Sequence, residues 1–378
     1  MPTPDYAVIG GGIVGLTIAR ELAMRGGGVT VFEKEAHLGE HASGRNSGVL
    51  HAGFYYAPDS LKARLTAHGN HMLREFCAEH DVPVHSCGKV VVASDPAQLP
   101  ALDELARRGQ ANGVRLEVID EKQLADLEPL ARTHERAIWS PDTAVADPHA
   151  VTAALHRDLE RRRVTIRTST AVTGPLKAGH VVNAAGLYAD RVAAWYGFCD
   201  DYVMMPFKGL YWYGDASAPH LQRHVYPVPD PRNPFLGVHF TVTPTGGVKV
   251  GPTAIPALSR EAYSGGIRRD EAREILGAFP TFIRGGHHDV PALLRGELPK
   301  YSRRWLQHQA RALVPSATGF TIRGTPGIRA QLMHKATGRL EMDFVVRGDE
   351  RSTHVLNAVS PAWTSSLAFA QYVVDRTG

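Results

Sequence analysis

The first thirty-three residues contain the pattern that most restricts how this chain can fold. An apolar run over residues 5–9 is followed directly by Gly10-Gly11-Gly12-Ile13-Val14-Gly15, by a helical repeat of apolar residues, and by a second apolar run over residues 29–32. Glu33 ends that second run. The order strand, Gly-x-Gly-x-x-Gly, helix, strand, acid is typical of a βαβ unit that binds a dinucleotide.

Each residue of this pattern has a physical reason to be there. Gly10 permits the tight turn, Gly12 lets a pyrophosphate approach the backbone, and Gly15 lets the helix pack closely on the strand. The start of the helix offers free N–H groups and a positive dipole end to the phosphates. Glu33 can accept hydrogen bonds from the adenosine ribose hydroxyls. We include the neighbouring Lys34 among the predicted cofactor-binding residues. The alternative interpretation is a glycine-rich turn in some other α/β domain, but it would not explain an acidic residue at the end of the second strand.

Composition excludes several classes of protein. The chain has 378 residues, is 43% hydrophobic and carries a formal net charge of only +4, so we expect a folded protein and no nucleic-acid partner. The three cysteines and nineteen histidines show no metal-ligand spacing, and we predict no metal. We find no signal peptide and no apolar run of about eighteen residues. We therefore expect a cytoplasmic protein without a transmembrane segment, a peripheral membrane contact remaining open.

Three further stretches are candidates for the cofactor site. The loop after Glu33 is small, polar and glycine-rich, which suits a segment lying along a flat cofactor. A buried strand over residues 180–184 ends in small residues, and a late strand over residues 354–357 leads into another helix N-terminus. The cofactor-binding residues that we predict from these stretches are Arg45, Asn46, Ser47, Gly48, Val49, Ala185, Gly186, Ser360, Pro361, Ala362, Trp363 and Thr364.

The pattern of the sequence changes between about residues 205 and 322, where prolines are frequent and strand-like segments dominate. The chain then returns to an α/β pattern. This arrangement predicts a second, β-rich domain inserted between parts of the first.

The chain resembles the D-amino-acid-oxidase-like superfamily of FAD enzymes, and within it the L-2-hydroxyglutarate dehydrogenase/oxidase family. Two segments are specific to that branch, Arg45-Asn46-Ser47-Gly48-Val49-Leu50-His51 and Gly237-Val238-His239-Phe240-Thr241. Similar stretches cover nearly the whole length: residues 43–56, 60–64, 182–190, 225–231, 235–241, 327–331 and 357–361.

The resemblance implies FAD rather than NAD, bound non-covalently. It implies an α/β plus α+β fold, with a Rossmann-like FAD-binding domain and an inserted β-rich substrate domain, as in D-amino-acid oxidase and glutathione reductase. We place the discontinuous FAD-binding domain at residues 1–80, 146–204 and 323–378. The substrate-binding domain then comprises residues 81–145 and 205–322.

The implied reaction is removal of hydride from a carbon bearing a hydroxyl, in a small anionic 2-hydroxy acid resembling L-2-hydroxyglutarate. Departures from the family pattern at Leu210, Thr253 and Trp363 fall in segments expected near the flavin ring. A second interpretation therefore stays open, in which the flavin enzyme oxidises an amino acid, an amine, or a sugar or cyclitol alcohol. A third is an inactive binding module. The electron acceptor could be oxygen, a quinone or a soluble carrier.

A 2-hydroxy acid needs an anchor for its carboxylate and a base near its hydroxyl. Arg329 is the predicted anchor, because its planar fork matches a carboxylate and related oxidases have an arginine on this late segment. Lys208 could bind a second carboxylate or the flavin edge. His51 and His239 are equal candidates for the base, since imidazole titrates near neutrality.

His51 has a second interpretation, because some relatives tether the flavin through a histidine in this region. A third is an ordinary hydrogen-bonded histidine without a role in the reaction. We also expect Tyr55 and Tyr226 to line the substrate pocket, although both could be packing aromatics.

Overall fold

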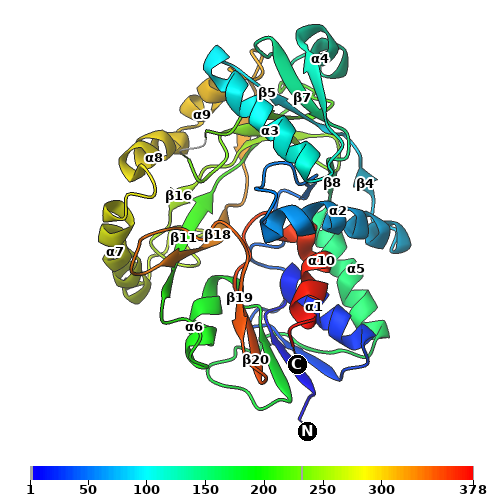
Figure 1. Cartoon of the computed structure of the whole chain (residues 1–378), viewed down its shortest axis with the longest axis vertical. Coiled ribbons are helices and arrows are strands. Elements are labelled where there is room, and N and C mark those ends of the chain that lie inside the picture. Colours follow the sequence, from blue (N-terminus) through cyan, green and yellow to red (C-terminus); the bar gives the residue numbers. More distant parts are fainter. Residues whose placement is uncertain (1–2, 231–232, 378) are drawn as a thin grey trace.

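The computed structural model describes residues 3–230 and 233–377, so Pro231 at the end of one family-like segment lies outside the described residues. Figure 1 shows an elongated molecule with the two termini at one end and a second group of strands and helices at the other. Within the described residues, each helix is either too short or too polar to cross a lipid bilayer.

A six-stranded sheet forms the end of the molecule that holds both termini. Its order is β19-β20-β10-β1-β2-β9, with all neighbours parallel except the edge strand β19. The strands are β1 (Tyr6–Ile9), β2 (Val29–Phe32), β9 (Thr165–Arg167), β10 (His180–Asn183), β19 (Val345–Gly348) and β20 (Ser352–Asn357). The strands come from three separated parts of the chain, and the predicted Rossmann-like fold is confirmed.

Helices cover this sheet and bury its apolar strands. They are α1 (Ile13–Met24), α2 (Leu61–Glu79), α5 (Pro148–Arg161), α6 (Ala189–Ala194) and α10 (Ala362–Val374), with the 3-10 turn η2 (Gly186–Tyr188) before α6. In Figure 1, α1, α2, α5 and α10 gather beside the sheet and α6 lies apart from them. Helix α10 is apolar or small nearly all round, and it is buried between α1 and α2.

An eight-stranded sheet forms the other end, in the order β17-β12-β15-β14-β13-β5-β7-β6. Neighbours are antiparallel, except that β13 and β5 run parallel. The strands are β5 (Lys89–Val92), β6 (Glu117–Asp120), β7 (Arg136–Ser140), β12 (Trp212–Gly214), β13 (His224–Pro227), β14 (His239–Val242), β15 (Val248–Gly251) and β17 (Phe320–Arg323). The helices beside it are η1 (Pro96–Gln98), α3 (Leu99–Ala111), α4 (Glu121–Leu127) and α9 (Arg303–Ala310).

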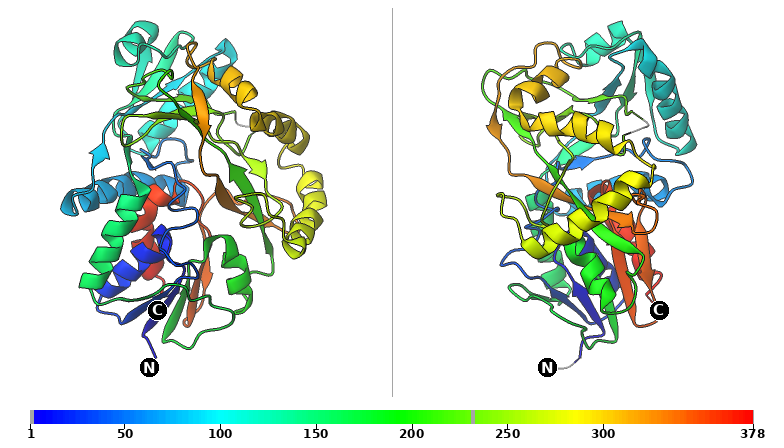
Figure 2. Two further views of the ribbon diagram at one scale, coloured as in Figure 1. Left: turned by 180° about the vertical axis from the view of Figure 1, so that it is seen from behind. Right: turned by 90° about the vertical axis from the view of Figure 1, so that its left-hand side faces the viewer.

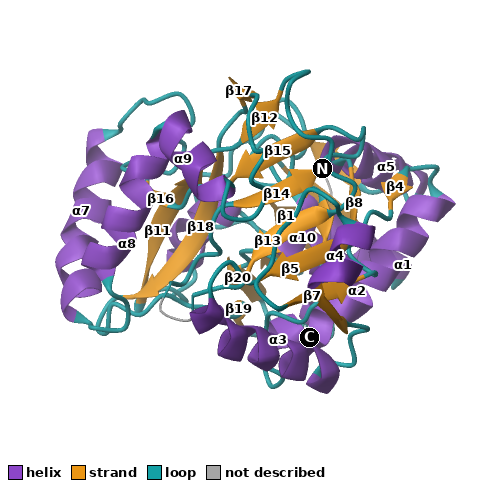
Figure 3. Ribbon diagram, turned by 90° about the horizontal axis from the view of Figure 1, so that it is seen from above, coloured by secondary structure: helices purple, strands orange, loops and turns teal. Residues whose placement is uncertain are grey.

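Two three-stranded sheets join these layers. The first, β16-β11-β18, consists of β11 (Tyr202–Gly209), β16 (Ile255–Pro256) and β18 (Gly327–His334). Figure 3 shows it beside α7 (Arg269–Arg284) and α8 (Val290–Glu297), and η3 (Leu298–Tyr301) follows α8. The second, β3-β8-β4, consists of β3 (Val49–Leu50), β4 (Val84–His85) and β8 (Ala144–Ala146).

The first of these sheets does not follow the predicted domain boundaries. The boundary between residues 204 and 205 falls inside β11, and β18 pairs with β11 over its whole length. Strands β11 and β18 thus pair with each other and belong to neither of the two large sheets. Figure 2 shows this long antiparallel pair of strands running between the two ends of the molecule.

A buried ion pair fixes the second part of the chain to α6. Arg260, which is 1% exposed, donates from Nη1 and Nη2 to the two carboxylate oxygens of Asp190 at 2.5 and 2.8 Å. It also donates to Leu187 O and to Glu274 Oε1. These bonds connect a loop after β16 to the first turn of α6, so they hold the two parts of the fold together.

Replacing Asp190 with alanine would leave the Arg260 guanidinium buried with only Glu274 as its charged partner. Loss of one member of a buried ion pair typically costs about 3–5 kcal/mol of unfolding free energy. We expect Asp190→Ala to lower the urea midpoint accordingly. Glu104→Ala, which removes an exposed ion pair on α3, should leave the midpoint unchanged. Equal midpoints for the two variants would contradict this account.

Candidate functional site

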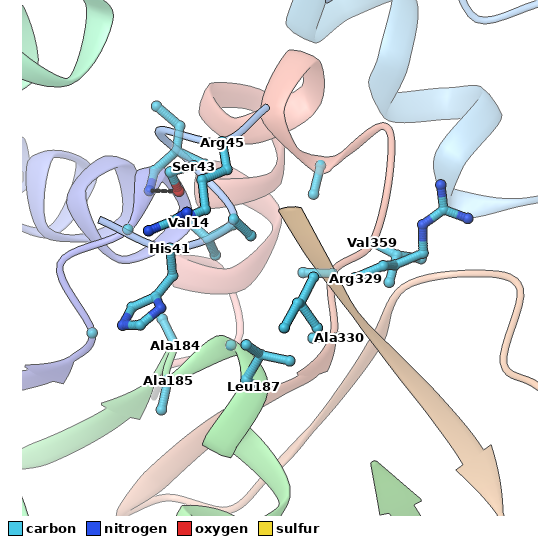
Figure 4. Close-up of a pocket in the computed structure, with 18 of the residues that line it drawn as sticks. Val14, His41, Ser43, Arg45, Ala184, Ala185, Leu187, Arg329, Ala330 and Val359 are labelled. Carbon is cyan, nitrogen blue, oxygen red and sulfur yellow. Dashed lines mark hydrogen bonds between the residues drawn. The ribbon is translucent and has the colours of Figure 1, made fainter. Parts of the chain in front are cut away.

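A single long cavity of about 700 Å³ runs from the six-stranded sheet to the β11-β18 pair. Figure 4 shows its two ends, with His41, Ser43 and Arg45 on one side and Arg329 on the other. The predicted site residues that line it are Gly10, Gly12, Glu33, Lys34, Arg45, Asn46, Ser47, Val49, His51, Ala185, Gly186, Arg329, Ser360, Pro361, Ala362, Trp363 and Thr364. Gly15, Gly48, Lys208, His239, Tyr55 and Tyr226 are not among its lining residues.

The glycine-rich turn is too crowded for side chains. Gly10 has φ +113°, and a Cβ there would lie 2.4 Å from Ala184 O at the end of β10. A Cβ at Gly15 would lie 1.9 Å from Gly10 O. Gly15 therefore acts from behind the cavity, by allowing α1 to approach β1, and this is the packing role that the motif predicts.

The acid at the end of β2 is held in a fixed position. Glu33 is buried, its Oε2 accepts a hydrogen bond from Gly11 N at 2.6 Å, and its Oε1 accepts one from Glu35 N at 2.9 Å. Each carboxylate oxygen has a further lone pair. Glu33 lines the cavity, so the carboxylate can still accept bonds from hydroxyl groups of a ligand.

Ser43 is a site residue that sequence reasoning missed. Its Oγ accepts a hydrogen bond from Ile13 N, the first residue of α1, at 2.8 Å, which the dashed line in Figure 4 marks. The loop thus caps a helix thirty residues earlier in the chain. Nothing in the sequence links Ser43 to Ile13, because the bond depends on how the loop folds back.

Charged residues at the nucleotide end of the cavity form ion pairs with one another. Lys34 pairs with Glu35 and lies 2.7 Å from Glu261. His41 Nε2 lies 3.0 Å from Glu35, and its Nδ1 lies 2.9 Å from Tyr263 OH. Glu35, His41 and Glu261 could together offer ligand atoms to a cation. The ammonium of Lys34 contacts both carboxylates and offsets one of their two negative charges, so a cation is already present in the cluster.

The N-terminus of α10 supports the flavin end of the site. Thr364 Oγ1 donates to Val49 O at 3.0 Å and accepts from His51 N at 3.2 Å, which ties the helix to the family-like loop. Trp363 lines the cavity, and its indole Nε1 is a buried donor with no hydrogen-bond partner among the described residues. Unsatisfied buried donors are rare, so this one fits a bound ligand with acceptor atoms. Together with the glycine turn and Glu33, these residues fit FAD.

Arg329 lies on β18 opposite Phe207 of β11 and points into the far end of the cavity. Its guanidinium lies 4.9 Å from the ring centroid of Phe235 and makes no hydrogen bond or ion pair with any described residue. Burial lowers its pKa from the ordinary value. Arg329 is partly buried and its remaining exposure is to the cavity, so a guanidinium without a carboxylate partner there favours an anionic ligand.

Three buried lysines, Lys62, Lys89 and Lys249, lie around this end of the cavity. Burial lowers the pKa of Lys62 and of Lys89 to about 7 and that of Lys249 to about 8. The charge of Arg329 lowers the pKa of Lys62 further, against an opposite effect of Asp343. Among the described residues, none of these ammonium groups makes an ion pair within 4.0 Å. Arg329 is therefore surrounded by amines that carry positive charge only when they are protonated.

The two candidate bases lie in different environments. His51 lines the cavity, and burial followed by the charge of Lys89 holds its pKa well below the ordinary value. His239 lies behind the cavity, where Nδ1 is 2.8 Å from Gly237 O and the ring stacks on Tyr226 at 3.9 Å. Burial lowers the pKa of His239 to about 3. Only His51 is placed to reach a ligand in the cavity.

The prediction for Lys208 needs correction. Strand β11 directs alternate residues to opposite faces, and Phe207 and Gly209 line the cavity. Lys208 therefore faces the other way, where Nζ donates to Ala262 O at 2.5 Å and to Tyr263 O at 3.0 Å. Its role here is to hold the loop that carries Glu261. Tyr55 and Tyr226 likewise lie behind His51 rather than in the cavity lining.

Several other lining residues carry no signal in the sequence. The connection between β9 and β10, residues 170–173, lies along the nucleotide end, and Tyr211 lies at the opposite end. Arg191 and Arg268 line the cavity as well. Apart from Arg191, which lies on α6, these residues reach the site through loops whose course is fixed only by tertiary packing.

Comparison with known proteins gives one consistent result. The FAD dependent oxidoreductase family, DAO, matches residues 5–376. The chain is 38% identical to the mitochondrial L-2-hydroxyglutarate dehydrogenase of Caenorhabditis elegans, covering 100% of this chain and 93% of that protein. It is 33% identical to the human mitochondrial enzyme of the same name, covering 98% and 88%.

Solved structures show the same fold. L-α-glycerophosphate oxidase from Mycoplasma pneumoniae, solved dithionite-reduced with FAD bound, superimposes with a TM-score of 0.80 at 23% identity, covering 100% of this chain and 95% of that one. Glycine oxidase from Geobacillus kaustophilus gives a TM-score of 0.71 at 19% identity, covering 99% and 94%. The glycine turn, Glu33 and the three-part parallel sheet thus have their explanation: this chain belongs to the DAO family of FAD-dependent oxidoreductases.

Proposed function

We propose that this protein oxidises the C–OH group of a small 2-hydroxy acid to a keto group, with L-2-hydroxyglutarate as the model substrate. The observation that carries this proposal is the partly buried Arg329 guanidinium, which has no anionic partner among the described residues and lines the cavity at its ring end. The names of the most similar relatives support it.

In this proposal each residue has one task. Arg329 binds the substrate carboxylate through its planar fork and so fixes the position of the hydroxyl-bearing carbon. His51 takes the hydroxyl proton, because its low pKa keeps the imidazole neutral before reaction. FAD, when bound, supplies the acceptor for the hydride that leaves this carbon.

An amino-acid or amine substrate is the second candidate, and Arg329 could anchor an amino-acid carboxylate equally well. The surroundings argue against it, because Lys62 and Lys249 already place positive charge near this end of the cavity. A protonated amino group would be repelled there, whereas a hydroxyl would not. A dicarboxylate would gain from the same charges.

We further propose the division of labour implied by the two large sheets, with cofactor binding on the six-stranded side and substrate binding on the eight-stranded side. Cys77, Cys87 and Cys199 are all buried and free, which supports a reducing compartment, and we infer a cytoplasmic location. The electron acceptor is left as oxygen, a quinone or a soluble carrier.

The proposed reaction can be tested by the absorption spectrum of the purified protein. We expect a flavin spectrum that bleaches when L-2-hydroxyglutarate is added under anaerobic conditions, and we expect no bleaching by L-glutamate, which differs in carrying an ammonium group. Bleaching by amino acids or polyols, with no response to 2-hydroxy acids, would overturn the proposed substrate class and leave the cofactor in place.

The glycine turn gives a prediction about cofactor retention. In Gly15→Ala the new Cβ would meet Gly10 O at 1.9 Å, so α1 must move away from the phosphate-binding turn. We expect this variant to be purified with little flavin, measured as the ratio of flavin to protein absorbance. Gly174→Ala is the control, because a Cβ there meets nothing within 4 Å. Full flavin content in Gly15→Ala would contradict the packing argument.

The carboxylate anchor gives a third prediction. Arg329→Met should raise the apparent Kd for L-2-hydroxyglutarate by about 30-fold or more, since losing one partner of a buried charge pair costs ~2 kcal/mol or more. Arg329→Lys keeps the charge but loses the fork, so we expect only partial recovery. The measurement is the substrate dependence of the anaerobic flavin reduction rate, with Arg284→Met on α7 as the control. An unchanged Kd in Arg329→Met would remove Arg329 as the anchor.

A further inference from the structure

Lys89 is a buried lysine that the proposed reaction does not yet use. It lies at the start of β5 and is 0% exposed. Its ammonium lies among three aromatic rings, 4.4 Å from the ring centroid of Tyr226, 5.1 Å from that of Tyr55 and 5.4 Å from that of Phe54. Across the described chain, its Nζ makes no ion pair. A permanently charged amine in this position would be expensive, so its presence calls for an explanation.

Within residues 3–230 and 233–377, the one polar side-chain atom in hydrogen-bonding range of Lys89 Nζ is Nδ1 of His51, at 3.5 Å. This distance is at the outer limit for a hydrogen bond, and such contacts often tighten when substrate is bound. His51 lines the cavity and Lys89 does not, so the amine approaches the imidazole from behind. Nε2, on the other side of the ring, is the nitrogen left for the substrate.

Two other imidazoles near Lys89 have their tautomers fixed by the backbone. Val242 N donates to Nδ1 of His224 at 3.0 Å, so the proton of neutral His224 is on Nε2, which lies 3.2 Å from Cys87 Sγ. Nδ1 of His239 faces Gly237 O at 2.8 Å and therefore carries the proton. His51 differs, because its Nδ1 faces an amine that can either donate or accept.

We propose that Lys89 is the positioning residue for His51: as the free base it accepts the Nδ1–H bond, and this leaves the Nε2 lone pair to take the substrate hydroxyl proton. With Lys89 as an ammonium, the bond reverses, Nδ1 accepts, and the proton of neutral His51 moves to Nε2, which then cannot act as a base. This inference rests on the proposed role of His51.

The charges around the pair agree with a neutral Lys89. Burial lowers the pKa of Lys89 to about 7. The groups that face it are His51, Tyr55, Cys87, His224, Tyr226 and His239, and none of them is a carboxylate. When His51 takes a proton during reaction, a neutral Lys89 avoids two adjacent cations, so the pair carries at most one positive charge.

The sign of the pH dependence follows. Below the Lys89 pKa the ammonium forces the unproductive tautomer, and above it the free base restores the productive one. The rate of flavin reduction should therefore rise with pH through about 7, the pKa of Lys89. In Lys89→Met this limb should disappear or move to lower pH, because the remaining titration is that of His51, whose pKa is held below its ordinary value first by burial.

The tautomer can be tested without any substrate. In ¹⁵N-histidine-labelled holoenzyme held above the Lys89 pKa, the His51 signals are those missing from His51→Gln. We expect an Nδ1-protonated ring in the wild type and a loss of that preference in Lys89→Met. An Nε2-protonated His51 in the wild type, or the same tautomer in both proteins, would overturn the proposal whatever the substrate is.

Kinetics give the second test, with anaerobic reduction by L-2-hydroxyglutarate. We expect His51→Gln to lose about 100- to 10,000-fold, and Lys89→Met to lose about 10-fold or more with little change in apparent Kd. Because Lys89 acts through His51, the double variant should match His51→Gln within about twofold. Lys89→Arg, which remains charged, should be no faster than Lys89→Met.

The outcomes separate the two ideas. If His51→Gln keeps its rate, the proposed base is wrong, and the tautomer experiment still decides what Lys89 does to His51. The second case is that His51→Gln is slow and that adding Lys89→Met to it lowers the rate by the same factor as adding Lys89→Met to the wild type. Lys89 then has only a structural role, and the inference fails. Flavin content and thermal midpoint serve as checks that each variant is folded.

Discussion

The close packing of α1 against the end of β1 is the contact on which the cofactor site depends. Gly15 lies so near Gly10 O that a Cβ would come within 1.9 Å, and Gly10 in turn meets Ala184 O at the end of β10. Two glycines therefore bring one helix and two strands together at one point. The N-terminus of α1, the carboxylate of Glu33 and the small residues after β10 can then surround a single dinucleotide.

The rest of the cavity depends on segments that are distant in sequence. The loop over residues 43–51 is capped onto α1 through Ser43 and tied to α10 through Thr364, more than three hundred residues later. Strand β18 closes the far end by pairing with β11. Because each of these contacts uses backbone groups, the loop is held in one course, and residues such as His51 acquire fixed positions.

Electrostatics at the ring end follow from burial rather than from composition. The net charge of the chain is only +4, yet Arg329 and three lysines gather around one end of the cavity with depressed pKa values. Such a cluster is tolerated when a ligand brings the missing negative charge or when some members stay neutral. The proposed assignments use both routes, since Arg329 receives a carboxylate and Lys89 serves as a free base.

The sequence alone determined the βαβ unit and the FAD family, because glycine spacing and a terminal acid reflect backbone geometry that few other residues permit. His51 and Arg329, both proposed from the sequence, line the cavity. The sequence could not decide which face of a strand meets the cavity: Lys208 and His239 lie on strands whose orientation is fixed by the sheets around them. Successive side chains of a strand point to opposite faces, so a shift of one residue changes what a side chain contacts. Only the tertiary structure could therefore separate Lys208 and His239 from the site, and only it revealed Ser43, Glu261 and Lys89.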